Sequence, residues 1–101
     1  MSLAPDSDAA PVTDHIHYTS WSANLEAPQH AEDRELVVAQ AVEAVTFTAS
    51  GTFVNLVTHA NHGHPSGYLF EELDAVFGDD IITGYVDQCG CGGHVTRVVV
   101  K

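Results

Sequence analysis

Both cysteines of the chain fall in one five-residue segment, Cys89-Gly90-Cys91-Gly92-Gly93, which also holds three of its eight glycines. Thiolates are strong nucleophiles and soft metal ligands, and the flanking glycines allow a partner to approach the backbone closely. A bridge between two cysteines separated by one residue would close a small, strained ring, so we expect reduced thiols. The sequence therefore predicts that the chemistry of this protein is concentrated in this segment.

Histidines extend the chemistry that this segment could perform. Cys89, Cys91 and His94 have the spacing Cys-x-Cys-x2-His, and thiolate with imidazole suits zinc, copper(I) or iron. A fourth ligand would have to come from the loop that contains His59, His62 and His64. The same histidines can equally be loop residues satisfied by water and carboxylates, and the glycines can simply turn a hairpin. A metal site and a plain turn therefore both remain open.

Conventional catalysis is weakly indicated. A cysteine hydrolase needs an oriented base and a buried substrate pocket, for which 101 residues leave little volume. A thiol redox protein needs positive charge to stabilise its thiolate, and the acidic composition does not supply it. The adjacent carboxylates Glu71-Glu72 and Asp79-Asp80 are typical of solvated surface positions. We therefore expect a protein that is not an enzyme.

Charge excludes several classes of partner. Fourteen acidic residues face three basic ones, Arg34, Arg97 and Lys101, for a formal net charge of −11. Nucleic acids and anionic membranes would be repelled. An acidic excess with almost no lysine is typical of proteins from salt-loving cytoplasms, where a Debye length of about 3 Å in molar salt screens the repulsion. We expect a halophilic source.

The chain length corresponds to one domain, and hydropathy gives no sign of export. No run of about 18 apolar residues is present, and the N-terminus lacks the basic and apolar regions of a secretory signal. We therefore expect a cytoplasmic protein without a membrane span. Residues 1–14, rich in Ala, Pro, Ser and Asp, are predicted to be a disordered acidic tail, and residues 15–101 a single α/β domain that carries the turn at 89–93.

Hydrophobic periodicity predicts a β-α-β-α-β-β order in that domain, with a mostly parallel sheet and a C-terminal antiparallel hairpin. Ser66 is the expected N-cap of the second helix and Gly78 its stop. In chain order, the predicted elements are a strand at Thr19–Leu25, a helix at Ala31–Val45, a strand at Thr52–Thr58, a helix at Tyr68–Phe77, and strands at Ile81–Val86 and His94–Val100.

This topology predicts where the candidate residues meet. If the first three strands are parallel, the loops that follow them lie along one edge of the sheet, where open α/β sheets usually bind ligands. The two cysteines would then share that edge with five histidines: His30, His59, His62, His64 and His94. An antiparallel third strand would instead separate the cysteines from the histidine loop.

Three stretches resemble a known family: residues 85–98, which include the Cys-Gly-Cys-Gly-Gly segment, residues 21–26 and residues 55–65. They are similar to the CGCGG family of radical-SAM-modified RiPP proteins, small proteins known largely from haloarchaea. The resemblance covers most of the predicted domain. It implies a ribosomally made substrate that a partner radical-SAM maturase modifies at Cys89, Gly90, Cys91, Gly92 and Gly93.

The resemblance also assigns the cofactors. S-adenosylmethionine and an iron-sulfur cluster would belong to the maturase, so the chain itself would need none. One chemical argument supports modification at this segment. A radical derived from S-adenosylmethionine can abstract a hydrogen atom from a glycine Cα, because the flanking amide and carbonyl stabilise the product radical, and a neighbouring thiolate can then close a thioether. A domain that precedes the motif would serve as the docking surface of the maturase, or the modified protein would act whole.

Overall fold

The structure is a computed structural model that describes residues 13, 15–26, 30–88 and 93–101. Both cysteines, Gly90, Gly92 and the predicted tail, except Thr13, lie outside the described residues. Short 3-10 turns η3 (Ala60–His62) and η4 (Pro65–Gly67) precede α2, and η5 (Gly78–Asp80) follows it. The main elements are β1 (Trp21–Leu25), α1 (Arg34–Thr46), β2 (Phe53–Thr58), α2 (Leu69–Phe77), β3 (Ile81–Gln88) and β4 (His94–Val100).

The four strands form one mixed sheet in the order β1-β2-β4-β3. β1 and β2 are parallel, whereas β4 is antiparallel to both β2 and β3. The α/β class and the C-terminal antiparallel strands are confirmed, but the sheet is mixed rather than mostly parallel. The reason is that β4 returns between β2 and β3, so the crossover through α2 leaves a gap that β4 fills with two antiparallel ladders.

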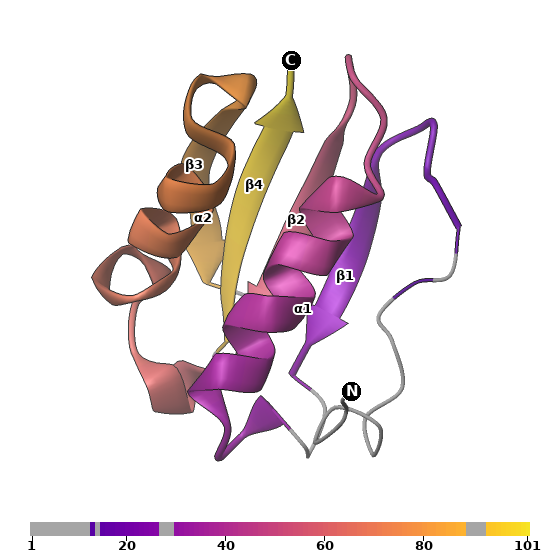
Figure 1. Cartoon of the computed structure of the whole chain (residues 1–101). Coiled ribbons are helices and arrows are strands. Elements are labelled where there is room, and N and C mark those ends of the chain that lie inside the picture. The colour runs from indigo at the N-terminus through magenta and orange to yellow at the C-terminus, as the bar shows by residue number, and fades with distance from the viewer. Residues whose placement is uncertain (1–12, 14, 27–29, 89–92) are drawn as a thin grey trace, which may run out of the picture.

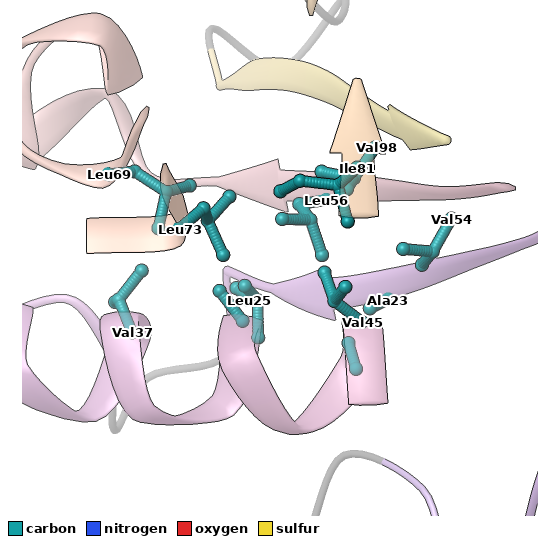
Figure 2. Close-up of a cluster of buried hydrophobic side chains, with 12 residues drawn as sticks. Ala23, Leu25, Val37, Val45, Val54, Leu56, Leu69, Leu73, Ile81 and Val98 are labelled. Atoms are coloured by element: carbon teal, nitrogen blue, oxygen red, sulfur yellow. The ribbon is translucent and has the colours of Figure 1, made fainter. Parts of the chain in front are cut away.

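Both helices lie on one face of this sheet, which gives the molecule two layers (Figure 1). Alternation along the strands sends Ala23 and Leu25 of β1, and Val54 and Leu56 of β2, toward the helices. These side chains and Val37 of α1 are almost fully buried between the layers, as Figure 2 shows. Burying each such side chain contributes about 1.5–3 kcal/mol relative to exposure.

Local chemistry explains where the helices begin. The Asp33 side chain accepts a hydrogen bond from the backbone N–H of Leu36 at 3.0 Å, so it caps α1, and the helix starts three residues later than predicted. Ser66 does not cap α2 as predicted. It lies within η4, and Tyr68 is the residue before α2. Gly78 ends α2 with a positive φ of 52°, as expected for a stop residue.

None of the helices in the described part of the chain is long and apolar enough to cross a bilayer.

Candidate functional site at the edge of the sheet

The ends of the four strands form one transverse row. Leu25, the last residue of β1, pairs with Thr58 at the end of β2, and Thr58 lies opposite His94, the first residue of β4. His94 in turn lies opposite Gln88, the last residue of β3. β3 therefore runs in the same direction as β1 and β2, although β4 separates it from them. The loops after the first three strands share one edge, as predicted.

Three aromatic side chains gather near the β4 and β3 side of this row. The His64 and Tyr85 ring centroids are 4.2 Å apart, those of His64 and His94 5.3 Å, and those of Tyr85 and His94 5.7 Å. The Tyr85 hydroxyl lies 3.0 Å from Nδ1 of His94, at hydrogen-bond distance. His94 is the first residue after the Cys-Gly-Cys-Gly-Gly segment, so this cluster lies directly at the base of that segment.

A backbone hydrogen bond sets the tautomer of one of these rings. Nδ1 of His64 accepts from the N–H of Ser66 at 3.2 Å, which caps η4. A neutral imidazole whose Nδ1 accepts must carry its proton on Nε2. In this arrangement Nε2 of His64 carries the proton and acts as a donor. To bind a metal through Nε2, the neutral ring would have to carry its proton on Nδ1 instead, so the hydrogen bond from the Ser66 N–H would have to break.

The other two loop histidines point to different places. Nε2 of His62 lies 2.6 Å from the carbonyl oxygen of His30, so its ring joins the loop after β2 to the connection between β1 and α1. His30 is itself 2% exposed, and its Nε2 lies 2.6 Å from Oε1 of Gln40 in α1. These contacts stabilise the loops at the edge, and their acceptors are a backbone carbonyl and an amide rather than the water and carboxylates considered from the sequence.

His59 lines a separate, shallow pocket of about 330 Å³ with Glu26, Ala60, Asn61 and Gly93. This pocket lies between the ends of β1 and β2 and the start of β4. Its walls combine a carboxylate, an imidazole and an amide. The edge therefore presents a polar hollow beside Gly93 and an aromatic cluster around His94.

Gly93, the last residue of the motif, has a structural reason to be glycine. It is buried, and a Cβ atom built there would collide with Oε2 of Glu26 and lie 2.6 Å from the carbonyl oxygen of Thr58. No side chain fits without displacing the backbone of β2. Glu26 and Tyr85 were not singled out from the sequence. Two signals could have found them: each lies at or near the carboxyl end of a strand that reaches this edge, and each falls within a stretch that resembles the family.

Two buried hydroxyls lie inside the same end of the domain. Thr96 is fully buried, and neither its hydroxyl nor that of Tyr68 has a hydrogen-bond partner among the described residues. Burial raises the pKa of the Tyr68 phenol, while the nearby Thr58 hydroxyl and the Arg34 guanidinium oppose that shift. Thr58 approaches the phenol without meeting hydrogen-bond geometry, so it moderates the effect of burial without removing it.

Within residues 13, 15–26, 30–88 and 93–101, no group of three or more His, Cys, Asp or Glu side chains could hold a metal ion. The predicted ligand set is therefore split. His64 and His94 come together, whereas His59 and His62 are held elsewhere, and Cys89 and Cys91 lie outside the described residues. Among the described candidate ligands, His64 and His94 are the two whose rings meet.

A comparison with protein-family models gives one match, which spans residues 1–101 and is described as "Putative radical SAM target protein". The chain belongs to this radical-SAM target family. Comparisons with curated proteins and with solved structures found no match. The family description characterises its members as targets of a radical-SAM enzyme, that is, as substrates.

Proposed function

We propose that this chain is a ribosomally synthesised RiPP-type substrate whose Cys89–Gly93 segment is modified by a radical-SAM maturase. The observation that carries the proposal is the match of the whole chain, residues 1–101, to the radical-SAM target family. The chain is acted upon and needs no cofactor of its own. S-adenosylmethionine and the iron-sulfur cluster belong to the maturase.

The strand pairing at the described edge supports this role, because it holds the residues that flank the motif. The motif joins the last residue of β3 to the first of β4, and both lie in a row held by pairing with β2. Gly93 packs against Glu26 and Thr58 at one end of the motif, and His94 contacts Tyr85 at the same end. An enzyme that binds this domain would thus find the residues on both sides of Cys89–Gly92 held in the sheet edge.

The chemistry that we propose is a thioether between a cysteine sulfur and a glycine Cα of the motif. The maturase cluster donates one electron to S-adenosylmethionine, which releases methionine and a deoxyadenosyl radical. That radical takes a hydrogen atom from the glycine Cα, and the cysteine sulfur bonds to the carbon while its proton goes to solvent. The remaining electron returns to the cluster. Each bond therefore leaves the product two hydrogen atoms lighter.

Mass spectrometry tests this proposal directly. Protein purified from the native host and protein made without the maturase are compared as intact chains and as peptides. We expect a mass difference confined to the peptide that contains residues 89–93, and its loss in Cys89→Ser or Cys91→Ser variants. A substitution at His59, outside the motif, is the control. Identical masses for the two preparations would refute the proposal.

One observation favours a second candidate function, a metal site. Metal–nitrogen bonds of about 2.0–2.1 Å put the centroids of two tetrahedrally arranged imidazole rings about 5 Å apart. His64 and His94 have centroids 5.3 Å apart. Together with Cys89 and Cys91 they would make a set suited to zinc, copper(I) or iron. The bond from Ser66 to His64 would have to break first.

Metal analysis separates the two candidates. Protein made without the maturase is incubated separately with zinc, copper(I) or iron and dialysed. The metal reading predicts one bound ion that is lost in Cys91→Ser and in His94→Gln, but retained in His59→Gln, because His59 lies in the separate pocket. Absence of bound zinc, copper(I) and iron in the wild-type chain would eliminate this candidate and leave the first untouched.

A further inference from the structure

β3 is an edge strand that leads directly into the motif. In the described sheet its strand neighbour is β4 on one side only, so the backbone groups on its other side are available for pairing. Natural edge strands are commonly protected by lysine or proline, and Ile81–Gln88 contains neither. A register irregularity between Tyr85 and Asp87 limits the regular part of the strand to Ile81–Tyr85. A short strand from a partner could add to this stretch.

Apolar side chains remain exposed along the same strand. Ile82 is 57% exposed, Val86 47% and Tyr85 38%. Ile82 pairs with Val99, which in turn pairs with Phe53, so an apolar row crosses the sheet on the face away from the helices. Large exposed apolar groups on an unpaired edge are typical of a binding surface and unfavourable in water.

A groove of about 450 Å³ lies beside β3 on the helix side, between that strand and α2. Its walls combine an apolar ring with two carboxylates. An added strand sends alternate side chains to opposite faces of the sheet, so every second residue would reach this groove. A lysine or arginine fits it best, since its alkyl stem can lie on Phe70 and its charge near the carboxylates. The groove is lined by Ser66, Phe70, Glu71, Asp74, Gly78, Ile81 and Thr83.

We propose that the free edge of β3 and its acidic groove are the docking site of the maturase, which adds a strand to Ile81–Tyr85 and places a cationic side chain between Glu71 and Asp74. This inference rests on the proposed function and adds a location to it. Because β3 continues into the motif, an enzyme strand held on this edge would present residues 89–93 to the active site in a fixed register. A second copy of this chain, at net charge −11, would bring like charge to an acidic edge.

Charge reversal at two adjacent glutamates tests whether the acidic groove binds a cationic side chain of the maturase. Glu71 and Glu72 are both exposed and both lie in the first turn of α2, but only Glu71 lines the groove. Helix-terminus effects on the two are therefore matched. With the radical-SAM enzyme that modifies the wild-type chain, we expect Glu71→Lys to weaken binding by about tenfold or more and Glu72→Lys to change it little. Equal effects of the two reversals would overturn the groove assignment. Glu71→Gln is a milder variant if Glu71→Lys is unstable.

A second pair of substitutions, one on β3 and one on α2, tests whether the maturase docks on β3. Ile82 on β3 and Val76 on α2 are both β-branched and both 57% exposed. We expect Ile82→Glu to reduce the extent of modification strongly and Val76→Glu to leave it unchanged, with both variants retaining the wild-type melting temperature within a few degrees. Full modification of the Ile82→Glu variant would refute docking at β3.

Hydrogen exchange locates the contact. In the complex with the maturase we expect new protection of backbone amides in Ile81–Tyr85 and none in β1, the opposite edge of the sheet. Protection confined to β1 or to α1 would place the enzyme elsewhere and overturn the inference, and so would protection of β3 through self-association of the chain without the enzyme. If the wild-type chain is never modified, the proposed function fails. If it is modified without protection of β3, only the docking inference fails.

Discussion

The Glu26 carboxylate lies directly against the Cα of Gly93, on the side where any other residue would carry its Cβ atom. Glu26 follows the last residue of β1, and Gly93 precedes the first residue of β4. Two segments that are far apart in the sequence thus meet at the base of the motif. The contact fixes the start of β4 against the ends of β1 and β2.

The first prediction concerns this contact. Gly93→Ala should lower the free energy of unfolding by about 2 kcal/mol, because the new methyl group overpacks a site bounded by Glu26 and the Thr58 carbonyl. Glu26→Ala in the same chain should recover only part of the loss, since the carbonyl remains. Urea unfolding of the two single variants and the double variant measures this. Gly84→Ala is the control, because nothing lies within 4 Å of its added Cβ. A Gly93→Ala protein as stable as the control would show the contact to be unimportant.

The second prediction concerns the buried Thr96 hydroxyl. Thr96→Val keeps the shape of the side chain and removes a hydroxyl that lacks a partner among the described residues, so it should stabilise the domain by about 1 kcal/mol. Denaturant midpoints compare it with Thr83→Val on the neighbouring strand, whose side chain is only partly buried. Destabilisation by Thr96→Val would mean that the hydroxyl is satisfied in solution, for example by a bound water.

The third prediction concerns alkaline pH. Burial raises the pKa of Tyr68 in the folded state above its ordinary value of 10.0, so the folded chain holds this proton more tightly than the unfolded chain does. The resulting stability is fully present below pH 10.0 and is lost as the pH rises through the folded-state pKa. Tyr68→Phe should flatten this part of the profile, whereas Tyr18→Phe, at a side chain that is 77% exposed, should not. Equal alkaline profiles for Tyr68→Phe and wild type would contradict the assignment.

The fourth prediction concerns salt. With a net charge of −11, repulsion among carboxylates should destabilise the fold in dilute buffer and be screened as the Debye length falls from about 10 Å at 0.1 M to about 3 Å at 1 M. The urea midpoint should therefore rise between these concentrations of potassium chloride. Substituting three exposed acidic residues outside the groove with lysine should reduce the rise. A midpoint that is constant or falls with salt would argue against a halophilic origin.

Much of the secondary structure follows from local sequence. Runs of apolar and β-branched residues predict β2 and β4, and the helical spacing of apolar residues with an acidic first turn predicts α1. β4 has the predicted bounds, and α1 differs by three residues at its start because the Asp33 side chain caps the helix. Residue type alone predicts Ser66 as the cap of α2, but Ser66 lies inside the 3-10 turn Pro65–Gly67, which His64 caps.

By itself, the sequence determined the strands and helices and the acidic surface, because these depend on local periodicity and on composition. It predicted that the histidine loops share one edge only on the condition that the first three strands run in the same direction, which the structure meets. Only the tertiary structure decided that β4 inserts between β2 and β3, that His64 meets Tyr85 and His94 while His59 and His62 turn away, and that Gly93 must be glycine. These facts depend on the register of strands that are distant in the chain. Local patterns carry no information on such pairing, because many registers bury the same apolar residues and only packing of the whole domain selects one.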